Sequence, residues 1–135
     1  MPSVLIVDDN TPFRVTLRTA LERAGYGVVE ADNGQIALQL LAQNPVDVVV
    51  TDILMPSFDG IELIRHLRRD DFLLPILAMS GGVRTGNYDA LDPALKLGPT
   101  AAIAKPFRMA EFVALVGRLV AGISPQTTGS SKDRG

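Results

Sequence analysis

The segment VDVVVTDILMPSFDG, residues Val46–Gly60, decides the fold that we expect for this chain. Five of its first six residues are valine or threonine, and such a β-branched run is typical of a strand that is buried on both faces. The run stops at Asp52, after which Met55-Pro56 and Asp59-Gly60 favour turns. Open α/β folds bind ligands at the carboxyl ends of their central strands. Asp52 is therefore the first candidate for a reactive residue.

The composition is that of an ordinary globular domain, with 47% hydrophobic and 21% charged residues among 135. A net charge of −2 gives no sign of a surface for nucleic acid or for acidic membranes. The sequence has no cysteine, which excludes disulfides, thiolate metal ligands and thiol nucleophiles. No apolar run approaches the roughly 20 residues that a membrane-spanning helix needs, so we expect a cytoplasmic protein.

Short apolar runs alternate with helical patterns five times along the chain. The predicted strands are Val4–Val7, Gly27–Ala31, Val46–Thr51, Ile76–Met79 and Ala101–Ala104. Between and after them, apolar residues recur every three or four positions, as on the buried side of a helix. This alternation predicts an α/β fold, a doubly wound five-stranded parallel sheet with helices on both faces.

Local signals indicate where some of these elements end. Thr11 is the expected N-cap of the first helix, with Pro12 in its first turn, and Gly25 is expected to end that helix in a left-handed conformation. We expect one domain over residues 1–122. Residues 123–135 are polar and rich in glycine and serine, which predicts a disordered tail.

Functional side chains follow four of the predicted strands, at Asp8 and Asp9, Asp52, Ser80 and Lys105. Because parallel strands end on the same edge of the sheet, these groups are expected to share one crevice. Clustered carboxylates repel and need a cation, and ligands that are all oxygen favour Mg²⁺. A metal, an ammonium and a hydroxyl together suit a phosphoryl group. Asp52 is best placed to become an aspartyl phosphate.

Four motifs, in this order and each at a strand end, resemble the response-regulator receiver domain, the chemotaxis-regulator-like phosphoacceptor of two-component signalling. They are VLIVDDN from Val4, DILMPSFDG from Asp52, MSG from Met79 and KPF from Lys105. The resemblance covers about residues 3 to 121. It implies a flavodoxin-like sheet with the strand order 2-1-3-4-5.

The resemblance also implies a role for each residue near the metal. Asp52 would be the phosphoacceptor and a metal ligand. Asp9 would bind Mg²⁺ directly, and Asp8 mostly through water. The backbone carbonyl of Leu54 would supply a further ligand.

Three further expectations concern the readout of phosphorylation. Ser80 would be the switch hydroxyl, and Lys105 would contact a phosphoryl oxygen, with a cis bond to Pro106. Ala102 stands where the family often has an aromatic switch residue. We therefore expect phosphorylation to be read out through Ser80 and the loop Gly81–Asn87 rather than through an aromatic ring.

By this resemblance the chain is a phosphoacceptor that assists its own phosphorylation and dephosphorylation, and not an enzyme. Its donor would be a histidine kinase or a histidine phosphotransfer protein. A downstream protein would bind the face of the fourth helix, the strand Ala101–Ala104 and the last helix. With no output domain evident, the chain would act by binding this partner or by passing the phosphoryl group on, as a monomer or a weak dimer.

Two other functions stay open from the residues alone. One is a pseudo-receiver, a binding module with this fold but without phosphorylation. The other is a Mg²⁺-dependent phosphohydrolase of the haloacid-dehalogenase type. That family carries an Asp-x-Asp motif on its first strand, whereas Asp8-Asp9-Asn10 follows the first strand here.

Overall fold

The computed structural model describes residues 1–53, 60–70, 73–80 and 101–122. Its strands are β1 (Ser3–Val7), β2 (Gly27–Ala31), β3 (Val48–Asp52), β4 (Ile76–Ser80) and β5 (Ala101–Ala104). Its helices are α1 (Thr11–Arg23), α2 (Gly34–Gln43), α3 (Gly60–Asp70) and α5 (Met109–Val120). The expectations for Leu54, the loop Gly81–Asn87, the fourth predicted helix and the tail 123–135 lie outside the described residues.

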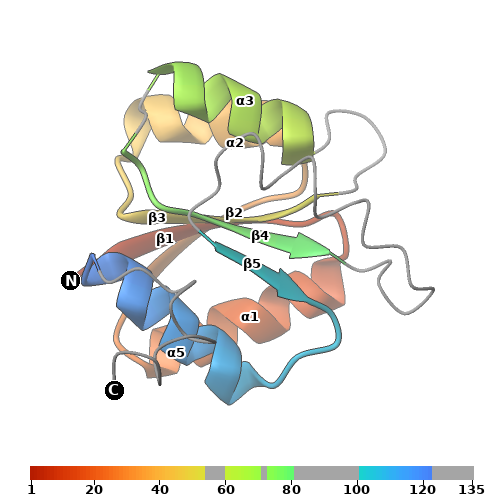
Figure 1. Ribbon diagram of the computed structural model, residues 1–135, viewed down its shortest axis with the longest axis vertical. Coiled ribbons are helices and arrows are strands. Elements are labelled where there is room, and N and C mark those ends of the chain that lie inside the picture. The colour runs from red at the N-terminus through yellow and green to blue at the C-terminus, as the bar shows by residue number, and fades with distance from the viewer. Residues whose placement is uncertain (54–59, 71–72, 81–100, 123–135) are drawn as a thin grey trace, which may run out of the picture.

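The five strands form one sheet in the order β2-β1-β3-β4-β5, and every neighbouring pair is parallel. Helices α2 and α3 cover one face of this sheet, and α1 and α5 cover the other (Figure 1). The predicted doubly wound architecture and strand order are therefore confirmed. Within the described residues, no helix has both the length and the apolar character needed to span a bilayer.

The core lies in two layers, one on each face of the sheet. Successive residues of a strand point to opposite faces, so Val49 packs in the layer under α2 and α3. Its neighbours Val48 and Val50 pack in the layer under α1 and α5. All five residues of β3 are buried, as the valine run predicts. Each fully buried valine or leucine side chain stabilises the fold by about 1.5–3 kcal/mol, which fixes the position of the strand that carries Asp52.

The start of α1 differs from the prediction by one residue. Thr11 is already helical, and Asn10 is the N-cap, with its Oδ1 accepting a hydrogen bond of 3.1 Å from the backbone N–H of Phe13. Asparagine and threonine are both good caps, so composition alone could not choose between them. At the other end Gly25 has φ +99°, which confirms the predicted left-handed termination.

The central strand also begins later than predicted, at Val48 rather than Val46. Asp47, just before the strand, still bonds to Ser3: its backbone N–H donates to the Ser3 carbonyl at 2.8 Å, and its carboxylate accepts from the Ser3 backbone N–H at 2.8 Å. At the other end the strand includes Asp52. The Asp52 backbone is therefore held in the sheet, which limits how far its carboxylate can move.

Candidate functional site

Strands β1, β3, β4 and β5 all end on one edge of the sheet (Figure 1). Asp8 directly follows β1, and Asp52 and Ser80 are the last residues of β3 and β4. Lys105 directly follows β5, and its backbone N–H donates to the Ser80 carbonyl at 2.8 Å. The structure thus places the predicted residues along one edge, as the parallel topology requires.

Three carboxylates converge at this edge. Asp8, Asp9 and Asp52 each offer one oxygen, and these three oxygens all lie within 4.8 Å of one another. Asp8 is completely buried and Asp52 is 8% exposed, whereas Asp9 is exposed. The donor atoms are all oxygen, which fits a hard divalent cation such as Mg²⁺. The Leu54 carbonyl, expected as a further ligand, lies outside the described residues.

The Lys105 ammonium faces two of these carboxylates. Its Nζ lies 3.2 Å from Oδ2 of Asp8 and 3.6 Å from Oδ2 of Asp52. The peptide bond from Lys105 to Pro106 is cis, as expected. One ammonium among three carboxylates leaves the site with an excess of negative charge, which a bound cation would offset.

The electrostatics of Asp52 point the same way. Burial, together with the neighbouring charges of Asp8 and Asp9, raises the pKa of Asp52 to about 6 despite the lowering effect of Lys105. Lys105 alone is thus too little positive charge to keep this carboxyl at its ordinary pKa. A divalent cation beside Asp52 would favour the ionised, nucleophilic form.

Ser80 contributes a hydroxyl that has no hydrogen-bond partner among the described residues. Its Oγ is buried and makes no hydrogen bond within the described part of the chain. A buried polar group without a partner costs about 1–3 kcal/mol. Among the described residues the hydroxyl is therefore an unused donor at the strand end next to Asp52, which fits an incoming oxygen ligand.

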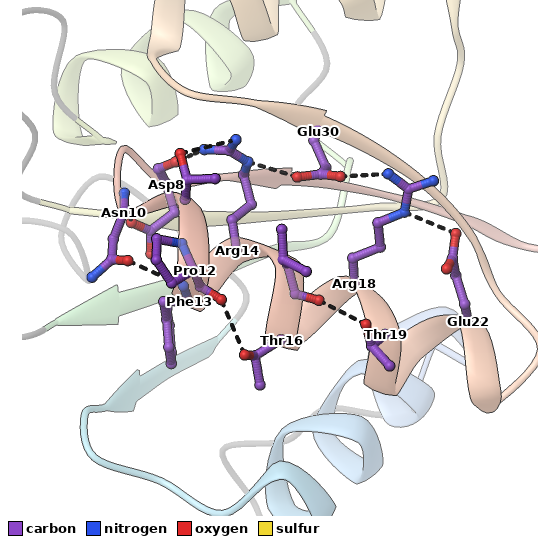
Figure 2. Close-up of polar contacts among 12 residues, drawn as sticks. Asp8, Asn10, Pro12, Phe13, Arg14, Thr16, Arg18, Thr19, Glu22 and Glu30 are labelled. Carbon is purple, nitrogen blue, oxygen red and sulfur yellow. Dashed lines mark hydrogen bonds and ion pairs between the residues drawn. The ribbon is translucent and has the colours of Figure 1, made fainter.

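Sequence reasoning missed the residues that hold Asp8 in place. The backbone N–H of Asn10 donates to Asp8 Oδ1 at 2.9 Å, and Nη1 of Arg14 donates to the Asp8 carbonyl at 2.7 Å. Figure 2 shows the Arg14 guanidinium between Asp8 and Glu30. The one signal in the sequence is Glu30 itself, a carboxylate inside the apolar strand GVVEA, because a charge at such a position needs a cationic partner.

The chain matches the family described as "Response regulator receiver domain" over residues 4–117. It is 37% identical over 114 residues to the phosphate regulon transcriptional regulatory protein PhoB of Pseudomonas aeruginosa, covering 83% of this chain and 48% of that protein. It is also 37% identical over 122 residues to the response regulator MprA of Mycobacterium sp. (strain KMS), covering 90% of this chain and 52% of MprA. The chain thus spans about half the length of these curated relatives.

A solved structure shows the same fold. The receiver domain of the Francisella response regulator 1452 superposes with a TM-score of 0.79 at 32% identity, covering 90% of this chain and 98% of that domain. Fold, strand-end residues and sequence similarity therefore agree: the chain belongs to the response regulator receiver domain family of two-component systems.

Proposed function

We propose that Asp52 accepts a phosphoryl group from a phosphohistidine on a histidine kinase or a histidine phosphotransfer protein. The observation that carries this proposal is the Lys105 ammonium, which lies between Asp8 and Asp52 in a cluster of three carboxylates. A carboxylate oxygen of Asp52 forms the bond to phosphorus while the bond from phosphorus to the imidazole nitrogen breaks. The imidazole leaves and takes up a proton from solvent.

The proposed ligands of Mg²⁺ are the carboxylates of Asp8, Asp9 and Asp52, with the backbone carbonyl of Leu54. When bound, Mg²⁺ neutralises charge between these carboxylates and the phosphoryl oxygens. With Asp52 phosphorylated, the Lys105 ammonium would contact a phosphoryl oxygen. The family resemblance and the oxygen-only donor set support these roles.

The buried Ser80 hydroxyl is the proposed switch group. It would donate to a phosphoryl oxygen and thereby gain the partner that it lacks in the described structure. Ala102 has no ring to rotate, so the readout would run through Ser80 and the following loop. Equal amide hydrogen exchange in residues 81–87 with and without a phosphoryl mimic would contradict this route.

The chain would be a phosphoacceptor that assists its own phosphorylation and dephosphorylation, rather than an enzyme that releases a separate product. Its proposed downstream partner is a protein that binds β5, α5 and the fourth predicted helix, with the chain a monomer or a weak dimer. Titration of the phosphorylated chain into candidate partners would test this surface.

The experiment that tests phosphoacceptance is the intact mass after incubation with phosphoramidate and Mg²⁺. Wild type should gain one phosphoryl group only when Mg²⁺ is present, and Asp52→Asn should gain none. Asp32→Asn is the matched control, because Asp32 is an exposed aspartate outside the cluster, and it should react like wild type. A folded wild type that gains no mass would reject the proposal in favour of a pseudo-receiver.

A further inference from the structure

Arg14 of α1 connects the first strand end to the neighbouring strand β2. Its Nη1 donates to the Asp8 carbonyl at 2.7 Å, and its Nε donates to Oε1 of Glu30 at 2.7 Å (Figure 2). The Arg14 and Glu30 side chains are only 13% and 18% exposed. Both bonds are short and charge-assisted, and the planar guanidinium makes them in two fixed directions.

Glu30 is itself held from a second side. Its Oε2 accepts from Nη1 of Arg18 at 2.6 Å, and Arg18 also pairs with Glu22 at 2.9 Å. Figure 2 shows the Glu30 carboxylate between the two guanidinium groups. Glu30 is thus a fixed support on β2, and the Arg14 guanidinium that it holds cannot swing freely away from Asp8.

Arg14 completes the set of contacts around Asp8. The Asp8 backbone N–H donates to the Ala31 carbonyl at 3.1 Å. The two carboxylate oxygens accept from Asn10 and from Lys105. The carbonyl is the remaining polar atom, and Arg14 is its donor.

The Asp8 carbonyl belongs to the peptide unit that joins Asp8 to Asp9. Because a peptide unit is planar, a bond that fixes this oxygen also fixes the nitrogen and Cα of Asp9. Asp9 is exposed, and no hydrogen bond to its side chain is seen in the described part of the chain. The direction in which its carboxylate leaves the backbone therefore depends on the orientation of this peptide plane.

We propose that Arg14 is a positioning residue that orients Asp9 for Mg²⁺ through the Asp8–Asp9 peptide, with Glu30 as its support. This assignment rests on the proposed metal-assisted phosphoacceptance. Arg14 touches neither the metal nor the phosphoryl group; it acts by restricting the backbone that carries a ligand. Outer contacts of this kind are worth about 10- to 100-fold in metal affinity at known metal sites.

Charge and positioning predict opposite effects of removing Arg14. Loss of a cation near three carboxylates would by itself tighten the binding of Mg²⁺. Loss of the hydrogen bond to the Asp8 carbonyl would weaken it, because Asp9 would have to be ordered when the metal binds. The direction of the change therefore distinguishes positioning from a simple charge effect.

The test is a titration of the metal-free full chain with MgCl₂, followed by the amide NMR shifts of β1 and β3. Arg14→Met should raise the half-saturating Mg²⁺ concentration about tenfold. Arg18→Met is the matched control, because it removes the same charge and also one bond to Glu30 but leaves the bond to Asp8; it should stay within about twofold of wild type. An Arg14→Met midpoint equal to or below that of wild type overturns the proposal.

Two further results keep this inference separate from the function on which it rests. If the amide shifts of wild type do not change with Mg²⁺, the proposed metal site itself is rejected. If wild type binds Mg²⁺ and is phosphorylated while Arg14→Met binds equally well, only the role of Arg14 fails. Should Arg14→Met not fold, Glu30→Gln tests the support instead. Because loss of a carboxylate by itself weakens the binding of Mg²⁺, its control is Glu22→Gln, which loses the same charge from a carboxylate that pairs with Arg18. Glu30→Gln should raise the midpoint clearly more than Glu22→Gln does, and equal midpoints for the two variants reject the proposal.

Discussion

The Lys105 ammonium lies 4.4 Å from the centroid of the Phe13 ring. The same ammonium contacts Asp8 and Asp52, and the Lys105 side chain is 20% exposed. Phe13 is in turn held by an edge-to-face contact with Phe107, whose ring centroid lies 5.8 Å away. The ring and the carboxylates together restrict where the lysine side chain can go, so Phe13 helps to keep the ammonium at the site.

Phe13→Leu should therefore slow phosphorylation. A partly exposed cation–π contact is worth about 0.5–1 kcal/mol, which corresponds to a rate about two- to fivefold lower if the contact orients Lys105 for reaction. The measurement is the time course of the phosphoryl adduct with phosphoramidate at saturating Mg²⁺. Phe13→Tyr keeps an aromatic face and should react at the wild-type rate. A leucine variant as fast as wild type would mean that the ring only fills space.

Ser80→Ala should separate stability from switching. The Ser80 hydroxyl is buried without a partner in the described residues, so its removal should leave the free energy of unfolding unchanged or raise it by about 1 kcal/mol. The same variant should lose most of the difference in amide exchange between the phosphorylated and free forms. Urea unfolding and amide exchange measure the two effects. A loss of stability above about 1 kcal/mol would show that the hydroxyl has a partner in the free protein.

Asp52→Asn should stabilise the metal-free protein at neutral pH. Burial raises the pKa of Asp52 to about 6, so between about pH 4 and pH 6 the unfolded chain releases this proton first and stability falls as pH rises. Asparagine does not ionise, so the variant should be more stable by about 1–3 kcal/mol at pH 7 in EDTA. The gain should vanish below about pH 4.

Urea unfolding in EDTA across this pH range measures the effect, and Mg²⁺ provides the control. Adding Mg²⁺ should stabilise wild type and leave Asp52→Asn nearly unchanged, because the variant lacks one of the proposed ligands. A variant that is less stable than wild type in EDTA at pH 7 would contradict the conclusion that the buried, ionised Asp52 carboxylate destabilises the metal-free protein.

Gly60→Ala should be among the most damaging substitutions in the chain. A Cβ at Gly60 would collide with the Asp52 carbonyl oxygen and lie 2.8 Å from Cα of Ile53, so the backbone at the end of β3 would have to move. We expect a loss of at least about 3 kcal/mol together with loss of Mg²⁺ binding. Gly117→Ala is the control, because Gly117 lies within α5 and a Cβ there would meet only the Tyr26 hydroxyl, at 3.4 Å, among the residues that the structure describes. It should raise stability by about 0.5–1 kcal/mol, and equal effects of the two changes in thermal unfolding would contradict this account.

The sequence was sufficient to predict the sheet and the functional residues at its edge. Buried β-branched runs recur between amphipathic segments, and parallel topology then requires Asp8, Asp52, Ser80 and Lys105 to end on one side. The supports of these residues could not be predicted in the same way. Arg14 binds a backbone carbonyl, and every residue has one, so its partner leaves no trace in the sequence.

The contact between Phe13 and Lys105 also could not be predicted from the sequence. Phe13 belongs to the apolar stripe of α1 and packs at the edge of the core under α1 and α5. Its side chain therefore has two functions, in packing and beside the ammonium, and helical periodicity reveals only the first. The packing of α1 against the strand ends, which brings the ring over Lys105, follows from tertiary structure.

Glu30→Gln should make the role of the Arg14–Glu30–Arg18 network visible as a pH dependence of stability. Burial would raise the pKa of Glu30, but hydrogen bonds from Arg14 and Arg18 and their charges lower it below its ordinary value of 4.5. The ionised form is thus favoured by folding, so its contribution to stability is complete above about pH 5 and is lost as pH falls through the pKa of Glu30 in the folded protein.

The Glu30→Gln variant keeps the shape of the side chain but not its charge, and should lose about 1–2 kcal/mol of stability at pH 7. Glu22→Gln removes a carboxylate that is 45% exposed and, within the described residues, pairs with Arg18, so it should change stability by less than about 0.5 kcal/mol. Urea unfolding at pH 7 and pH 3 measures both variants. A Glu30→Gln deficit that persists unchanged at pH 3 would show that packing, and not the ionised carboxylate, joins β2 to the strand end at Asp8.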